Sequence, residues 1–377
     1  MREFGIQKGG AIGPAPIRVL VVDDSHVIRG LLTRSLESDP EIKVVGTASN
    51  GKVAIDEVTR QEIDVVVLDI EMPVMDGMTA LPQLLAARPG MQVIMASTLT
   101  LKGASISMKA LSKGAADYVP KPSSTGEIHS AEDFKRELIS KVKTWGAVAR
   151  RRRASAAKPG SEAPVAPRRF PAGPIKLKEV PTLFRPDCIA VGSSTGGPQA
   201  LFKVFQMMGK VTHLPVFVTQ HMPATFTTIL AEHLGQASGM PTAEAKDGEP
   251  VIPGRIYVAP GDFHMTVQVE AGRKVLRLDK NPPESFCRPA VDPMLRSLAK
   301  AFNGKVLTVI LTGMGQDGLK GGHEIAAAGG VIAAQDEATS VVWGMPGAVS
   351  SAGLCSAVLP LSDIGPYVRK AISRMAA

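Results

Sequence analysis

The sequence predicts an α/β protein with two domains, and three observations support this prediction. The chain has 377 residues, which exceeds one ordinary domain of about 100–200 residues. Short apolar runs alternate with helical patterns in two separate regions, which indicates a parallel, doubly wound sheet in each. A basic segment rich in proline, alanine and arginine separates the two regions and has no hydrophobic period.

The first region, residues 17–140, is predicted to hold five parallel strands. Its apolar runs are continuous, as expected for strands that helices cover on both faces. Helical patterns lie between the runs, and ligands of such a sheet bind beyond the carboxyl ends of its strands. The predicted strands are residues 17–22, 42–46, 64–69, 92–97 and 117–120.

A linker is predicted over residues 141–186. Residues 150–176 contain eight Lys or Arg and one acid, so they carry +7 of the net charge of +8. Where proline dominates, we expect a semi-extended chain. We interpret the run Arg150–Arg153 as solvated linker, with weak contact to an acidic partner as the alternative.

The second region, residues 187–377, returns to α/β alternation. An antiparallel hairpin is predicted over residues 265–279, where two alternating segments flank Ala271-Gly272. We therefore expect a second doubly wound domain that also carries a hairpin. The other predicted strands are residues 188–194, 215–220, 255–260, 305–313 and 331–336.

Composition excludes several classes of protein. The charge outside residues 150–176 is close to zero, which argues against a nucleic-acid-binding surface. The three cysteines are far apart, which excludes a disulfide framework and a zinc knuckle. Neither a signal peptide nor an apolar run of about 18 residues is visible, so we expect no membrane insertion and a soluble cytoplasmic protein.

Polar residues stand at the ends of predicted strands in the first region. Asp23 and Asp24 follow the first strand, and Asp69 ends the third. Ser97 ends the fourth strand, and Lys121 follows the fifth. Each acid alone would be a helix cap or a loop charge. Because these strand ends meet at one edge, together they predict a site for Mg²⁺ and a phosphoryl group.

The second region contains a G-x-S-x-G motif at Gly192–Gly196, with Ser194 at its centre. It lies between an apolar strand and a helix opened by Pro198, so it predicts a tight turn that exposes the serine. A plain helix cap or a phosphate loop is the alternative. A Walker A motif is excluded because no Gly-Lys-Ser/Thr follows.

A serine nucleophile needs a base and an orienting acid. His221 follows a predicted strand and therefore lies on the ligand edge, whereas His264 opens the hairpin and could line the cleft instead. Asp317 follows a later strand, where it is either the acid or the N-cap of the next helix. The order Ser194, His221, Asp317 differs from the Ser, Asp, His order of α/β-hydrolases.

The motifs of the first region resemble the receiver domain of two-component response regulators, namely VLVVDDS, VVVLDIEMPVMDGM, MAS and YVPKP. The resemblance implies a flavodoxin-like strand order and phosphorylation of Asp69. It implies that Mg²⁺ is held by Asp24, Asp69 and the carbonyl of Glu71, with Asp23 beside them.

The same resemblance assigns three further residues to the response to phosphorylation. Lys121 would pair with the phosphoryl group and Ser97 would hydrogen-bond to it; Thr98 takes that role if the register is shifted by one. Tyr118 is the rotating aromatic of the family, or else an ordinary half-buried aromatic.

The motifs GSSTGG, TQHMP, VAPGDFHM, RPAVD and LTGMGQDG resemble the catalytic domain of the chemotaxis protein-glutamate methylesterases. Members of that family carry a receiver, a linker and this domain in the same order. The resemblance maps the catalytic triad onto Ser194, His221 and Asp317. Thr195 and the Met314 backbone fall where the family places supporting and oxyanion-binding groups, and Arg288 falls in a cleft-side segment.

The resemblance implies hydrolysis of glutamate 5-methyl esters on chemoreceptors, with deamidation of glutamines in some members and no cofactor for hydrolysis. The implied partners are methyl-accepting chemoreceptors and a chemotaxis histidine kinase. We expect the receiver to cover the Ser194 site until Asp69 is phosphorylated. The alternatives are a binding module without catalysis and a DNA-binding response regulator. The intact triad opposes the first, and the missing helix-turn-helix pattern opposes the second.

Overall fold

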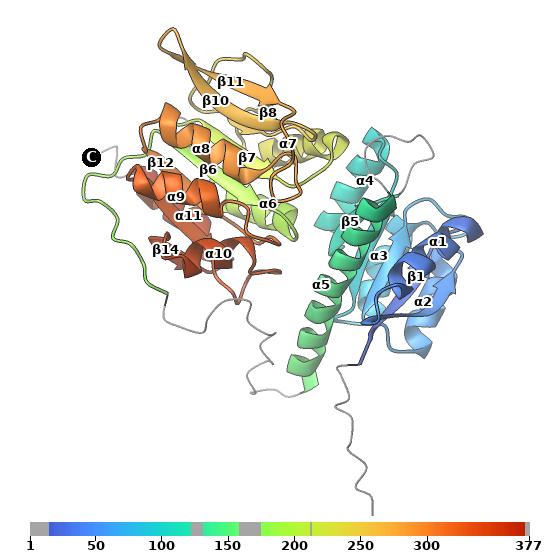
Figure 1. Cartoon of the computed structure of the whole chain (residues 1–377). Coiled ribbons are helices and arrows are strands. Elements are labelled where there is room, and N and C mark those ends of the chain that lie inside the picture. The colour runs from blue at the N-terminus through green and yellow to red at the C-terminus, as the bar shows by residue number, and fades with distance from the viewer. Residues whose placement is uncertain (1–14, 122–130, 158–174, 212, 374–377) are drawn as a thin grey trace, which may run out of the picture. The chain divides into compact units, whose positions relative to one another are not determined.

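The computed structural model describes residues 15–121, 131–157, 175–211 and 213–373 (Figure 1). These residues form two parallel sheets, each with its own helices, and a separate two-stranded hairpin. The α/β fold class predicted for both regions is confirmed. Part of the predicted linker, residues 158–174, lies outside the described residues. No helix of the described segments is both long enough and apolar enough to cross a bilayer.

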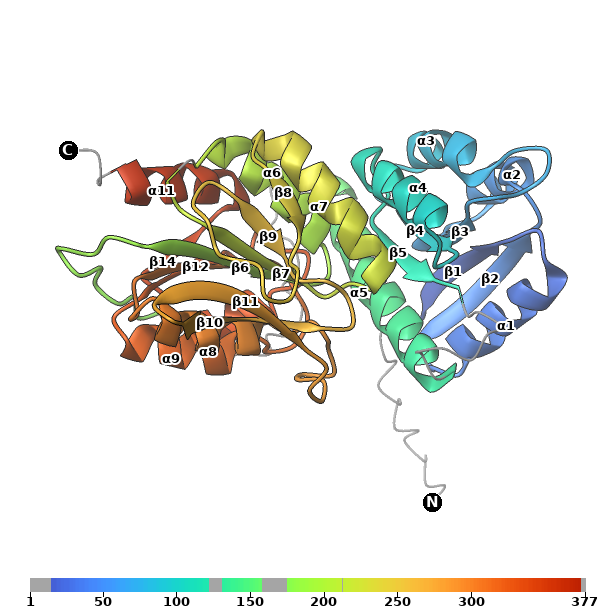
Figure 2. The same ribbon diagram turned by 90° about the horizontal axis from the view of Figure 1, so that it is seen from above.

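The first sheet has five strands in the order β2-β1-β3-β4-β5, which is the flavodoxin-like order. Figure 2 shows helices on both of its faces; α1 packs against α5, and α2 packs against α3. The strands are β1 (Ile17–Val22), β2 (Ile42–Ala48), β3 (Val65–Asp69), β4 (Gln92–Ser97) and β5 (Asp117–Pro120). The helices are α1 (His26–Glu37), α2 (Gly51–Arg60), α3 (Gly77–Ala87), α4 (Leu101–Ser112) and α5 (Ala131–Ala157).

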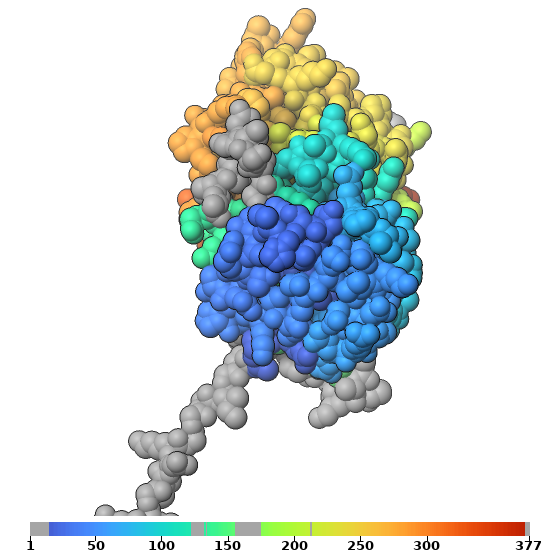
Figure 3. Space-filling view, turned by 90° about the vertical axis from the view of Figure 1, so that its right-hand side faces the viewer, coloured from blue at the N-terminus to red at the C-terminus, as the bar shows by residue number. Residues whose placement is uncertain are grey.

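Polar side chains define where four of these helices begin. Ser25, Asn50, Asp76 and Thr100 each accept a hydrogen bond from the backbone N–H three residues further on. Such a cap satisfies an N–H group that the helix leaves without an internal partner. Strands β3 and β4 consist entirely of buried residues. Figure 3 shows the outer surface of this N-terminal part in blue.

Helix α5 continues beyond residue 140, the predicted end of the first region. Residues 141–157, which composition assigned to the linker, continue the helix. Arg150 lies 3.4 Å from a carboxylate oxygen of Asp64, and Arg153 pairs with both Asp64 and Glu62. The interpretation of Arg150–Arg153 as solvated linker is therefore wrong for these two arginines. An isolated arginine run carries no hydrophobic period, and its acidic partners lie far away in the sequence.

The second sheet has seven strands in the order β14-β13-β12-β6-β7-β9-β8, and neighbouring strands are parallel throughout. Its strands are β6 (Cys188–Ser193), β7 (Val216–Gln220), β8 (Thr242–Glu244), β9 (Ile256–Val258), β12 (Val306–Ile310), β13 (Val331–Gln335) and β14 (Ala357–Leu359). Strands β10 (His264–Glu270) and β11 (Arg273–Asp279) form the predicted antiparallel hairpin. The short edge strands β8 and β14 were not predicted, because three residues are too few to show a period.

Helices cover both faces of this sheet (Figure 2). Helix α6 packs against α7 and α11, whereas α8 packs against α9 and the hairpin strand β10. From β6 the chain continues to β7 on one side and later returns to β12 on the other, so the carboxyl ends of these strands meet at a topological switch point. The helices are α6 (Gly197–Met208), α7 (Ala224–Ser238), α8 (Val291–Ala301), α9 (Leu319–Ala327), α10 (Met345–Ser351) and α11 (Leu361–Ser373).

The buried carboxylate that fixes α5 gives a first prediction. Asp64 is 1% exposed and accepts a hydrogen bond of 3.0 Å from the Arg18 N–H. Asp64→Ala deprives that N–H of its carboxylate acceptor and removes both arginine contacts, so it should lower the free energy of unfolding by about 2 kcal/mol. Arg153→Ala should cost less than about 1 kcal/mol, because Arg153 is 41% exposed.

The measurement is urea unfolding followed by the fluorescence of Trp145, which is buried in α5. A Trp343→Phe background removes the only other tryptophan, so the signal reports on the first domain. Equal effects of the two substitutions would contradict a central role for the Asp64 carboxylate.

Candidate functional site

Ser194 lies in the tight turn between β6 and α6. Gly196 has a φ of 74°, a left-handed conformation that favours glycine. A Cβ on Gly197 would lie 2.0 Å from Gln220 Oε1, so this position also requires glycine. The Ser194 N–H donates to the Thr312 carbonyl at 3.1 Å. The chain therefore turns sharply from strand to helix at the serine, as the motif predicted.

The structure brings together Ser194, His221 and Asp317, as predicted. His221 Nδ1 lies 3.1 Å from Ser194 Oγ, and His221 Nε2 lies 2.7 Å from Asp317 Oδ2. If Nε2 carries the proton and donates it to the carboxylate, Nδ1 has a lone pair for the serine hydroxyl. The three residues follow β6, β7 and β12, whose carboxyl ends meet at the switch point.

Asp317 is fully buried, and backbone groups surround its carboxylate. Its Oδ2 accepts from the Val291 N–H at 2.6 Å, and its Oδ1 accepts from Asp292 and Gly318 at 2.9 and 3.0 Å. Burial raises the pKa of Asp317, but His221 and the N–H groups of Val291 and Asp292 outweigh burial and lower that pKa. The carboxylate therefore stays ionised. It does not cap α9, whose N-cap is Gly318 without a side-chain bond.

A cysteine also contacts the candidate base. Cys287 Sγ lies 3.2 Å from His221 Nδ1, the same nitrogen that faces Ser194. Burial lowers the pKa of His221, but the charges and hydrogen bonds of Cys287 and Asp317 oppose burial and raise this pKa to about 10. The surroundings of the ring thus favour its protonated form.

Gln220 ties the nucleophile turn to the histidine loop, a role that the sequence analysis missed. Its Oε1 accepts from Ser193 Oγ at 2.7 Å, and its Nε2 donates to the carbonyls of Ser194 and His221 at 2.9 and 3.1 Å. Its position next to His221 was the available signal. It fixes the backbone on both sides of the Ser194–His221 contact.

The sequence analysis also missed Asp292, whose carboxylate supports the loop of the acid Asp317. Its Oδ1 accepts from Gly318 and Gly321 at 3.0 and 2.7 Å, which holds the loop that carries Asp317. Burial and the charge of Asp317 raise the pKa of Asp292 to about 6. Both Asp292 and Cys287 belong to the FCRPAVD segment, whose family likeness drew attention to Arg288 instead.

Two residues considered from the sequence have structural partners. His264 is buried; its Nε2 lies 3.2 Å from the Pro282 carbonyl, and its Nδ1 accepts from the Ala290 N–H at 3.2 Å. Both ring nitrogens are therefore occupied, and His264 is not the base. The Arg288 guanidinium binds Asp262 at 2.6 Å and also donates to two backbone carbonyls. It fastens the loop before α8.

Thr195 and Met314, the residues expected to support the oxyanion, lie in two loops of the site. The Thr195 carbonyl accepts from the Thr312 hydroxyl at 3.0 Å, which links the two loops. Met314 follows Gly313, whose carbonyl accepts from the Gly344 N–H at 3.1 Å. The Ser194 N–H already donates to the Thr312 carbonyl within the protein.

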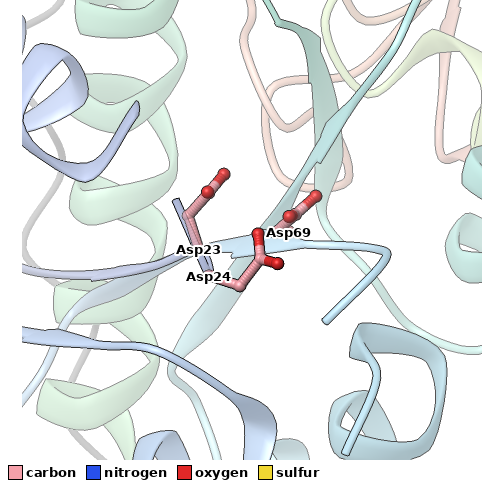
Figure 4. Close-up of side chains that lie close together, drawn as sticks. All are labelled: Asp23, Asp24 and Asp69. Atoms are coloured by element: carbon pink, nitrogen blue, oxygen red, sulfur yellow. The ribbon is translucent and has the colours of Figure 1, made fainter. Parts of the chain in front are cut away.

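Three carboxylates gather at the carboxyl edge of the first sheet (Figure 4). One oxygen from each of Asp23, Asp24 and Asp69 lies within 4.8 Å of the others. Asp69 ends β3 and is buried, Asp24 is exposed, and Asp23 Oδ1 accepts from the Ser25 N–H at 2.9 Å. Glu71 follows β3 in the exposed loop. These oxygen donors fit a hard divalent cation such as Mg²⁺.

The remaining receiver residues lie at the ends of the next two strands. The Ser97 hydroxyl donates to the Thr98 carbonyl at 3.2 Å, and the Lys121 N–H donates to the Ser97 carbonyl at 2.7 Å. The Thr98 hydroxyl contacts Thr100, the cap of α4, at 3.2 Å. Tyr118 lies in β5 and is 3% exposed, so it is more buried than an ordinary half-buried aromatic.

Known proteins resemble this chain over nearly its whole length. A family described as CheB methylesterase matches residues 189–368, and the response regulator receiver domain matches residues 19–132. A protein-glutamate methylesterase/protein-glutamine glutaminase of Azospirillum brasilense is 60% identical, over 97% of this chain and 95% of the relative. A protein of the same name, of the group 2 operon of Rhodospirillum centenum, is 58% identical, over 98% of this chain and 97% of the relative.

The crystal structure of the Thermotoga maritima CheB methylesterase catalytic domain is 39% identical, with a TM-score of 0.47 over 49% of this chain and 98% of that one. Identity of 60% over 97% of the chain, together with both domain matches, decides the family. The chain belongs to the CheB family of protein-glutamate methylesterases/protein-glutamine glutaminases, which carry a response regulator receiver domain.

Proposed function

We propose that this chain is a cytoplasmic serine hydrolase, activated by phosphorylation, that removes methyl esters from chemoreceptor glutamates and deamidates glutamines. The contact between His221 and both Ser194 and Asp317 carries the chemical part of this proposal. The names of the relatives support the substrate class. Residues 187–377 would carry the hydrolase, and residues 17–140 would carry the receiver.

In the first half of the reaction, Ser194 Oγ attacks the ester carbonyl while His221 Nδ1 takes the hydroxyl proton. The Asp317 carboxylate holds the ring through Nε2 and stabilises the imidazolium that forms. The imidazolium then gives its proton to the leaving methoxide, which departs as methanol. Water cleaves the acyl-serine by the same proton transfers, and a glutamine side chain would release ammonia instead of methanol.

The negative oxygen of the tetrahedral intermediate needs hydrogen-bond donors. The N–H of the residue after the nucleophile, Thr195, occupies the usual place for one donor in a strand-to-helix serine turn. We assign the Met314 backbone as a second, because its loop is tied to Thr195 through Thr312. Each such donor is typically worth about 10²–10³ in rate. The N-terminus of α6 adds a favourable dipole.

In the receiver, Asp69 would accept the phosphoryl group from a histidine kinase. Asp23, Asp24, Asp69 and the Glu71 carbonyl would hold Mg²⁺, which when bound neutralises charge on the transferring phosphoryl group. The Lys121 ammonium would pair with the phosphoryl oxygens, and Ser97 would donate a hydrogen bond to the phosphoryl group. Tyr118 would rotate in response to phosphorylation.

The central test follows methanol release from methyl-labelled receptor membranes. We expect release that a small phosphodonor with Mg²⁺ stimulates. Ser194→Ala should lose at least about 10⁴-fold, because it removes the nucleophile. Asp69→Asn should keep the basal rate without stimulation, because the acceptor carboxylate is gone.

The matched control is phosphorylation of Asp69 itself, measured by mass spectrometry in each preparation. No release from phosphorylated protein would refute the methylesterase proposal for those receptors and favour a binding module without catalysis. Salt-sensitive binding of duplex DNA by the second domain would favour a DNA-binding regulator instead.

Masking of the site by the receiver gives a separate prediction. Residues 175–377 alone should hydrolyse a small chromogenic ester faster than the unphosphorylated full chain, because the covering domain is absent. The shorter chain begins before Lys178, whose N–H donates to the Cys355 carbonyl at 2.8 Å and so belongs to the second domain. Equal rates would show that the receiver does not cover Ser194.

The pKa of His221 gives a prediction for the pH dependence. The ring accepts the Ser194 proton only when it is neutral, and its pKa is raised to about 10. Hydrolysis of a small uncharged ester should therefore rise by about tenfold per pH unit from pH ~7 toward that pKa. Rates of Ser194→Ala are subtracted to remove alkaline hydrolysis. A rate that is constant above pH ~7 would contradict the raised pKa.

A further inference from the structure

Cys287 lies inside the hydrolase site, yet the proposed mechanism does not use it. Its Sγ is 3.2 Å from His221 Nδ1, and Ser194 Oγ is 3.1 Å from the same nitrogen. Its side chain is partly exposed, whereas Cys188 and Cys355 are both fully buried. The site therefore contains a thiol–imidazole pair beside the serine–imidazole pair, and both pairs share one nitrogen.

The shared nitrogen links the two pairs through one proton. When the proton rests on the sulfur, His221 Nδ1 can accept from the Ser194 hydroxyl. When it rests on Nδ1, the sulfur is a thiolate beside an imidazolium, an arrangement that favours the thiolate in cysteine enzymes. Asp317, at 2.7 Å from Nε2, stabilises the imidazolium in that second form. The thiolate is the nucleophilic state of cysteine.

The loop that carries Cys287 holds it against His221. Glu284 and Cys287 exchange backbone hydrogen bonds of 3.1 and 2.9 Å, and Arg296 anchors the Glu284 carboxylate. Between them, Ser285 and Phe286 have φ of 52° and 63°, the left-handed conformation that is rare for such residues. Phe286 is 90% exposed. The turn thus sends Phe286 outward while Cys287 faces the histidine.

We propose that Cys287 is a covalent modification site: its sulfur contacts His221, hydroperoxides oxidise the thiolate form of this sulfur, and the oxidised sulfur blocks the hydrolase. Inhibition of ester hydrolysis rests on the proposed function. The reactivity of the thiol does not, because it depends on the surroundings of Cys287 and not on ester hydrolysis.

The oxidation step needs only the groups of the site and one molecule of hydroperoxide. The Cys287 thiolate attacks one peroxide oxygen, so that an S–O bond forms and the O–O bond breaks. Sulfur is oxidised to a sulfenic acid, and the peroxide is reduced. With hydrogen peroxide, the departing hydroxide takes the proton of the His221 imidazolium and leaves as water. The added oxygen then stands beside Nδ1, where it competes with Ser194. A dithiol reductant restores the thiol.

The first experiment measures thiol reactivity on the folded full chain at pH ~7. Iodoacetamide should label Cys287 about tenfold faster than glutathione in the same tube, since an ordinary thiol is only a few per cent thiolate there. Cys188 and Cys355 serve as internal controls and should stay unlabelled. Burial raises the pKa of Cys188 well above its usual value and that of Cys355 to about 11.

His221→Ala tests the pairing itself. It should slow the labelling of Cys287 by about tenfold, because the imidazolium is lost. Circular dichroism confirms that the variant is folded, and His221→Gln is the second variant if it is not. Labelling of Cys287 at the same rate with and without His221 would overturn the thiol–imidazole pair, whatever the esterase assay shows.

The second experiment measures inhibition. Hydrogen peroxide should reduce ester hydrolysis by the wild-type chain, and dithiothreitol should restore it, which separates thiol oxidation from methionine oxidation. Cys287→Ala, compared with its own untreated rate, should resist peroxide. The rise of the hydrolysis rate of Cys287→Ala with pH should also occur at lower pH than in the wild type, because Cys287 helps raise the pKa of His221. Equal peroxide sensitivity of Cys287→Ala and wild type would overturn the assignment.

Discussion

The second domain depends on one buried charge, the Asp317 carboxylate. Removing a carboxylate from water is costly unless hydrogen bonds surround it. Here the first backbone N–H groups of α8 and the N–H of Gly318 do this, so the helix terminus and the loop after β12 have to meet at one point. His221 Nε2 contacts the same carboxylate at Oδ2. The orientation of the histidine, and through it the environment of Ser194, follows from this constraint.

Sequence reasoning located both sites because parallel sheets gather their strand ends at one edge. Asp23, Asp24 and Asp69 on one sheet, and His221 on the other, could be predicted from strand ends, whereas Ser194 was predicted from the G-x-S-x-G motif. Asp317 needed the family resemblance to distinguish it from a helix cap. The resemblance also implied the strand order of the first sheet, whereas no order was predicted for the second, whose edge strands β8 and β14 are too short to show a pattern.

What could not be predicted depends on contacts between residues far apart in the sequence. Cys287 is 66 residues from His221, and no local pattern distinguishes it from a packing cysteine. Gln220 matters because two carbonyls and a hydroxyl surround its amide, which only the folded turn reveals. The extension of α5 brings arginines to Asp64, a buried acid that is 86 and 89 residues away from Arg150 and Arg153 in the sequence. Amino-acid composition indicates which segments are solvated, but it cannot predict which distant residues will contact each other.

The anchoring of α5 to Asp64 also sets how far the two domains can separate. Because α5 continues to Ala157 and Lys178 is already bound to the second domain, the tether between them comprises only residues 158–177. At about 3.5 Å per residue it reaches at most about 70 Å. Tethers of this size keep linked partners at an effective concentration of about a millimolar. A contact between any two parts linked in this way therefore needs a dissociation constant of only about a millimolar to be half occupied.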